Sequence, residues 1–286
     1  MLGTSTSGRR RAYQAFKYVV YILLTINVVL FFLDEWDAAG LLFDEGSVPF
    51  AELIRYFTAS IDSANWVVLL LLFELETYTI PDDKFTPRLA LTLNILRGVC
   101  YALITYSVYG YIVTWLDLFA YHPVAEGIAI CQQLGDDFLQ TLDEYVQITA
   151  NNCAALAQAP ELLVHSSVDG ELFTDSISLK DTLGLALVDV INAVTWLLVV
   201  IVLEMDVRLQ VRGLLEGRIN QVSKYIKFVL YSILAAAAIY WGVTGSFLDF
   251  WDAFLWLAAF IFIEMNVVEW QEETEAKKKQ QSQAST

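Results

Sequence analysis

Residues 183–205 read LGLALVDVINAVTWLLVVIVLEM, and within this run only Asp189 and Glu204 carry a charge. A membrane-spanning α-helix needs about 20 mostly apolar residues in succession, so this stretch predicts one. Five other stretches have a similar composition: 17–33, 64–79, 98–116, 227–247 and 253–270. The sequence therefore predicts an all-α integral membrane protein built as a bundle of six transmembrane helices.

The composition of the whole chain supports this fold class. Of the 286 residues, 57% are hydrophobic and only 17% are charged, whereas about 25% are charged in an ordinary soluble protein. This balance argues against one or two water-soluble domains. A lipid bilayer is the expected main solvent and partner of the chain.

Positive charge is distributed unevenly along the chain. Apart from Arg55 and Lys180, every Lys and Arg lies near the start of the first predicted helix, between the second and third, between the fourth and fifth, or after the sixth. The other loops are acidic. Because Lys and Arg favour cytoplasmic loops, both termini are predicted in the cytoplasm, with the acidic loops in the periplasm of a bacterial inner-membrane protein. The first helix is expected to be retained, since no small-x-small signal cleavage site follows it closely.

The segments between the helices complete the predicted domain organisation. It comprises a disordered cytoplasmic lead (1–16), helices one to three (17–117), an extracytoplasmic cap (118–180), helices four to six (181–270) and a disordered cytoplasmic tail (271–286). The cap is predicted to be α-rich, with a helix over 131–145 and a small hairpin that turns at Asp169-Gly170. One unbroken helix would hold Cys131 and Cys153 about 33 Å apart. A disulfide between them, which the sequence leaves open, therefore requires a chain reversal.

The three predicted hairpins share residues at matching positions. In each even-numbered helix, an Asp or Asn is followed by Trp after four residues and by Glu after eight more. These residues are Asp62, Trp66 and Glu74; Asn192, Trp196 and Glu204; and Asp252, Trp256 and Glu264. In each odd-numbered helix, a basic residue is followed by Tyr after four residues, and Asp beside aromatic residues marks the end. These residues are Lys17, Tyr21 and Asp34; Arg97, Tyr101 and Asp117; and Lys227, Tyr231 and Asp249. The chain is predicted to contain three repeated hairpins, with the cap inserted in the second.

The repeated acids have two interpretations. Ionisable groups within a bilayer are costly and indicate function, so Glu74, Glu204 and Glu264 could form an inner ring that binds or gates a cation. Alternatively, each Glu pairs with the Lys or Arg of its own hairpin, or accepts from its Tyr, and holds the helices together. A second, outer ring would consist of Asp34, Asp117 and Asp249, and it would concentrate cations at a pore mouth.

Two functions remain open from the sequence. One is a cation channel or cation-coupled transporter that uses the inner and outer acidic rings. The other is a non-transporting scaffold or accessory subunit, whose repeated ion pairs are structural and whose acidic cap contacts a membrane-protein partner. Enzymatic chemistry is not expected, because neither His122 nor His165 has a second metal ligand at zinc spacing and no phosphate-binding loop or nucleophile motif occurs. No cofactor, metal site or nucleic-acid partner is predicted.

Overall fold

The structure is a computed structural model. It describes residues 3–42, 56–76, 80, 86–124, 129–142, 144–157, 163–166, 172–212, 214, 217–245 and 247–261.

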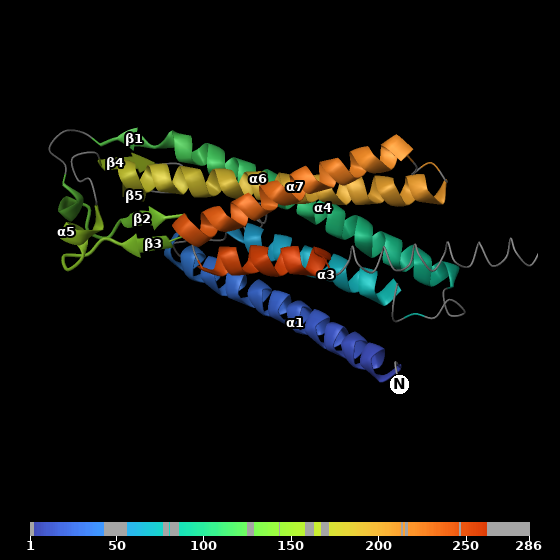
Figure 1. Cartoon of the computed structure of the whole chain (residues 1–286). Helices are drawn as coiled ribbons and strands as arrows, with labels where there is room; N and C mark the ends of the chain where they lie inside the picture. The colour runs from blue at the N-terminus through green and yellow to red at the C-terminus, as the bar shows by residue number, and fades with distance from the viewer. Residues whose placement is uncertain are drawn as a thin grey trace, which may run out of the picture.

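Long helices running lengthwise make up most of the molecule, and the strands gather at one end of the bundle (Figure 1). The helices are α1 (Gly3–Leu42), α3 (Thr58–Glu74), α4 (Pro87–Asp117), α6 (Ser176–Val211), α7 (Gly217–Thr244) and a further helix over 247–261. Neighbouring helices pack in chain order, α1 against α3, α3 against α4, α4 against α6 and α6 against α7. The N-terminus lies at the end of the bundle opposite the strands (Figure 1).

Four of the helices are long and apolar enough to cross a membrane. The candidate spans are Tyr13–Gly40, Pro87–Ala120, Ser176–Asp206 and Gly217–Thr244. On α1, the exposed face carries Ile22, Ile26, Val29 and Leu33, each with 47–60% of its surface uncovered. This stripe is what a lipid-facing helix requires, because hydrocarbon tails cover it in place of protein. The chain is thus a multi-pass membrane protein; α3, with 17 residues, and the 247–261 helix are shorter.

The helices extend further than the hydropathy of the sequence suggests. The chain is helical from Gly3, so the described part of the lead 1–16 is not the disordered segment that we predicted. Residues Ala12 to Lys17 are mostly good helix formers, and they extend the helix beyond the apolar segment. Helix α6 begins at Ser176, inside the predicted cap. Its first turn is capped by the Asp175 carboxylate, which accepts from the backbone N–H groups of Ile177 (2.8 Å) and Ser178 (3.1 Å).

The cap contains a β-sheet, and the prediction that it is α-rich is wrong. The strands β1 (His122–Pro123), β2 (Asp137–Thr141), β3 (Glu144–Gln147), β4 (Leu163–Ser166) and β5 (Leu172–Asp175) lie in the order β1-β4-β5-β2-β3. The helix predicted over 131–145 is replaced by a 3-10 turn at Ile130–Gln132 and the antiparallel β2–β3 pair. Gly135 has φ +100°, which interrupts a helix, and Phe138, Tyr145 and Val146 are residues that favour strands.

The hairpin predicted between Leu163 and Phe173 is present as the antiparallel pair β4–β5, in which His165 lies opposite Phe173. Its predicted turn at Asp169-Gly170 lies outside the described residues. The tail 271–286 lies outside them as well.

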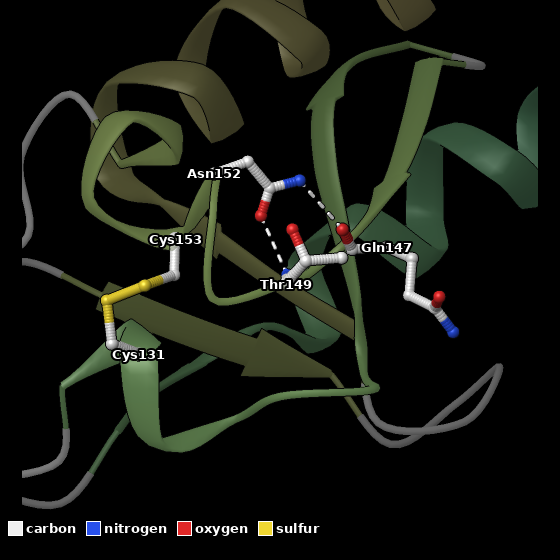
Figure 2. Close-up of a disulfide and its surroundings, with 5 residues drawn as sticks. All are labelled: Cys131, Gln147, Thr149, Asn152 and Cys153. Atoms are coloured by element: carbon white, nitrogen blue, oxygen red, sulfur yellow. Dashed lines mark hydrogen bonds between the residues drawn. A yellow bond between two sulfur atoms is a disulfide. The ribbon is translucent and has the colours of Figure 1, made fainter.

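Cys131 and Cys153 are joined by a disulfide, with Cα atoms 5.0 Å apart (Figure 2). The β2–β3 hairpin supplies the chain reversal that brings them together. Asn152 fixes the turn before Cys153, accepting from the Thr149 backbone N–H (2.7 Å) and donating to the Gln147 carbonyl (2.9 Å). The disulfide lies beside a small apolar cluster that includes the fully buried Phe138.

Removing this disulfide is expected to destabilise the sheet. Cys131→Ala and Cys153→Ala each open a loop of 22 residues, which costs about 3 kcal/mol by the loop-entropy model. Both variants should lower the thermal denaturation midpoint of the purified protein equally, and titration should detect a new free thiol. The matched control is Cys100→Ala, at a buried free cysteine in α4. Equal shifts in all three variants would contradict a stabilising role for the disulfide.

Candidate functional site

Three tryptophans meet at the centre of the bundle. Trp66 of α3, Trp196 of α6 and Trp256 of the 247–261 helix have ring centroids 6.0, 6.3 and 6.4 Å apart, in tilted and edge-on arrangements. All three have less than 9% of their surface exposed. They occupy the matching position of the three predicted hairpins. The triad, as we call these three residues, fills the space where α3, α6 and the 247–261 helix meet.

A cavity of about 710 Å³ adjoins the triad on the side of the β-sheet. All three triad residues line it, together with residues of α1, α3, α6, α7 and the 247–261 helix. Strands β2 and β3 contribute Gln140, Thr141, Glu144, Tyr145 and Val146. The sheet thus covers a chamber whose floor is the triad.

Carboxylates dominate the polar lining of this cavity. The lining acids come from α1, α3, β3, α6 and the 247–261 helix, and they are Asp34, Glu35, Asp37, Asp62, Glu144, Asp189, Asp249 and Asp252. Among the described residues, the lining includes no Lys, Arg or His. A concave surface lined by one sign of charge focuses its field into the cavity. The cavity therefore favours positively charged occupants.

Asp62 and Asp252 lie directly above the triad, each one turn of helix from a triad tryptophan. Asp62 interacts with the Trp66 side chain and Asp252 with the Trp256 side chain by hydrogen bonding. Asn27 of α1 donates to Asp252 Oδ1 from Nδ2 at 2.8 Å. In the described part of the chain, Asp62 Oδ1 is buried and has no hydrogen-bond partner. Both carboxylates line the cavity, so they would stabilise a cation that enters it.

Glu35 has a structural role at the edge of the same cavity. It accepts from the backbone N–H groups of Ala59 (2.6 Å) and Ser60 (3.1 Å), in the first turn of α3. These N–H groups have no partner within the helix. Glu35 therefore fixes α1 to the start of α3 and sets the position of Asp62.

The outer acids predicted from the sequence divide between two cavities. Asp34 and Asp249 line the large cavity, whereas Asp117 lines a neighbouring pocket of about 100 Å³. The two cavities share Tyr145 and Asp189 among their lining residues. From the sequence, Asp62 and Asp252 were predicted only as matching positions of the repeat and not as site residues. Each precedes a triad tryptophan by four residues, and this spacing is the signal that could have identified them.

At the other end of the bundle, Lys17 and Glu74 form a buried ion pair. Lys17 Nζ lies 2.6 Å from Glu74 Oε1, and the two side chains are 1% and 7% exposed. The Tyr18 hydroxyl donates to the same oxygen at 3.1 Å. Tyr21, the tyrosine of the predicted repeat, places its ring centroid 6.0 Å from Lys17 Nζ. In the first predicted hairpin, the acid and the base of the predicted repeat therefore lie together.

The acid and the base of the second predicted hairpin do not pair with each other. Arg97 pairs with Glu76 at 2.5 Å, and not with Glu204. Glu204 lies 3.6 Å from Arg208 of its own helix, with 43% of its side chain exposed, and hydrogen bonds with Tyr101.

The third base, Lys227, pairs with Asp206 at 3.2 Å. Glu264 lies outside the described residues. Glu76 and Asp206 both follow a Glu of the predicted repeat by two residues, and this acid-x-acid pattern is the sequence signal that could have identified them. Tyr231 packs at the edge of the central apolar cluster.

No group of three or more His, Cys, Asp or Glu side chains in the described part of the chain could hold a metal ion. No protein-family model, curated protein or solved structure matches the chain. Function therefore has to be inferred from the cavity and its charges.

Proposed function

We propose that the protein transports a cation across the membrane and that the acidic cavity is its cation-binding site. The observation that carries the proposal is the lining of the cavity, which combines eight carboxylates with no Lys, Arg or His among the described residues. Ionisable groups inside a membrane protein are costly and indicate a pathway for ions or substrates.

In this proposal the chain crosses the membrane six times, as three hairpins around a pseudo-threefold axis. The meeting of Trp66, Trp196 and Trp256 supports this arrangement, because residues at one position of a threefold repeat meet at its axis. The positive-inside rule puts the basic N-terminus in the cytoplasm. Since the sheet lies at the opposite end (Figure 1), the cavity would receive its cation from the extracytoplasmic side, in a bacterium the periplasm.

Coupled transport fits the geometry better than an open channel. The triad packs the axis below the cavity, and the buried Lys17–Glu74 pair lies nearer the cytoplasmic end. A pathway through the bundle would have to separate these groups transiently, as in alternating access. The closed floor supports a binding site that opens to one side at a time.

A non-transporting scaffold is the second candidate, and the ion pairs support it. Lys17–Glu74, Arg97–Glu76 and Lys227–Asp206 each join neighbouring helices near the proposed cytoplasmic ends. Pairs of this kind hide charge from lipid and stabilise a bundle without transport. On this reading, Glu74 and Glu204 have no role in permeation, and the sheet would contact a membrane-protein partner.

Flux measurements separate the two candidates. Proteoliposomes with the wild-type chain should take up K⁺, Na⁺ or tetramethylammonium faster than empty liposomes. The variant Asp62→Asn/Asp252→Asn should reduce uptake about tenfold, as expected for a loss of about 1.4 kcal/mol of binding free energy. The matched control is Asp181→Asn, an exposed acid of α6 outside the cavity, which should transport as wild type does. Wild-type uptake equal to that of empty liposomes would support the scaffold.

A further inference from the structure

We infer that the cavity binds an organic ammonium ion, with its charge near Asp62 and Asp252 and its hydrocarbon body against the tryptophan triad. The inference deepens the proposed function by naming the chemical class of the cation. It rests on that proposal only for transport, because the binding site itself is argued from the lining of the cavity.

The size of the cavity suits an organic ligand. Pockets for small organic molecules usually enclose about 300–1,000 Å³, and this cavity measures about 710 Å³. A metal ion needs far less space, since six to eight oxygen ligands surround Ca²⁺ at about 2.3–2.6 Å. The chamber is therefore large enough for a cation that carries several carbon groups.

Aromatic rings supply a surface that an organic cation can use. The lining aromatic residues are Phe31, Trp66, Tyr111, Tyr145, Trp196, Trp241 and Trp256. Four of the eight tryptophans in the chain are among them. Tryptophan has the strongest attraction of the aromatic side chains for ammonium groups, and quaternary ammonium ions are recognised by such rings. The same rings also remove the carbon groups of the ligand from water.

The arrangement of the carboxylates favours a diffuse charge over a compact one. The lining acids belong to five elements spread around the chamber, and the described residues include no set of three that could hold a metal ion. An alkylammonium ion spreads its charge over its carbon groups and needs no coordination shell. Asp62 lines this chamber beside the triad, and it is the residue that we assign to the ammonium group.

Binding of choline, compared with its uncharged carbon isostere 3,3-dimethylbutan-1-ol, tests the inference. The full chain in detergent would be titrated with each compound while tryptophan fluorescence and heat release are recorded. We expect choline to bind with a change in fluorescence. We expect 3,3-dimethylbutan-1-ol, K⁺ and Na⁺ to bind at least about tenfold more weakly.

Two variants locate the binding site. Asp62→Asn/Asp252→Asn should weaken choline binding about tenfold, and Asp181→Asn should leave it unchanged. Should the double variant fail to fold, Asp62→Asn alone serves, because it leaves Asp252 and its hydrogen bond with Asn27 intact. Equal binding of choline and its isostere, tighter binding of K⁺ or Na⁺, or binding that ignores the Asp62 substitution would each overturn the inference.

The outcomes also distinguish this inference from the proposed function. Choline binding without flux would uphold the organic-cation site and reject transport. Flux of K⁺ or Na⁺ without choline binding would uphold transport and reject the organic cation.

Discussion

Lys17→Met is expected to lower the free energy of unfolding by about 3–5 kcal/mol, the usual cost of removing one member of a buried ion pair. Glu74 would remain 5% exposed and lose the Lys17 Nζ that now lies 2.6 Å away. Only the Tyr18 hydroxyl would still donate to it among the bonds described above. The measurement is thermal or denaturant unfolding of the purified protein, followed by circular dichroism.

A double variant shows whether the cost arises from the unpaired charge. Lys17→Met/Glu74→Leu removes both charges and should recover most of the lost stability, since apolar replacements of buried pairs are often neutral. Glu204→Gln is the matched control, because the pair of Glu204 with Arg208 is long and well exposed; it should cost less than about 1 kcal/mol. If Glu204→Gln destabilised the protein as much as Lys17→Met does, the two repeat acids would be equivalent after all.

The difference between these two acids shows where sequence patterns lose their power. Spacing predicts that Glu74 and Lys17 lie on facing helices of one hairpin, and the structure joins the two side chains in an ion pair. The same spacing would also allow a pair between Arg97 and Glu204. The structure pairs Arg97 with Glu76, just after α3, because the long arginine side chain reaches whichever carboxylate lies nearest. That choice depends on tertiary packing, and one sequence does not reveal it.

The cap shows a different limit of the sequence. Apolar residues from Cys131 to Tyr145 fit a helical face, yet the segment forms a turn and two strands. A short amphipathic run can fit the period of a helix and that of a strand. Which of the two forms then depends on whether a neighbouring strand is present to pair with it. Strand β2 finds that partner in β5, which follows more than 30 residues later and pairs with it in parallel. The Gly135-Asp136 pair was the local signal against a continuous helix.

The candidate site could be predicted only in its components. Hydropathy identified the long apolar helices, and the repeat marked Asp62, Asp252 and the three tryptophans as matching positions. Their assembly depends on contacts between distant segments, such as the bond from Asn27 to Asp252, which are 225 residues apart. The roof of the cavity comes from strands that the sequence did not predict. The volume of the cavity depends on the fold and cannot be predicted from the sequence. The same holds for its lining, which among the described residues includes no basic side chain.

Trp196→Ala is expected to destabilise the protein by about 3–5 kcal/mol, the usual cost of truncating a buried tryptophan. Trp196 is 7% exposed, and its ring centroid lies 4.5 Å from that of Phe260 and 6.0 and 6.4 Å from those of the other two triad residues. Aromatic pairs of this kind add about 0.5–1.5 kcal/mol each beyond the area that they bury. Thermal unfolding measures the loss directly.

Trp36→Ala is the matched control for this truncation, because Trp36 of α1 is 60% exposed. This substitution should cost less than about 1 kcal/mol, although the Trp36 ring contacts Phe32 and Phe57.

Because the triad forms the floor of the cavity, Trp196→Ala should also raise the cation leak of proteoliposomes at temperatures where the variant is folded. Trp36→Ala should not raise it. A Trp196→Ala protein that unfolds at the temperature of Trp36→Ala and leaks no more than it does would show that the triad neither packs the bundle nor closes the floor of the cavity. A variant that is destabilised but does not leak would show that the triad packs the bundle while other groups, such as the Lys17–Glu74 pair, close the proposed path.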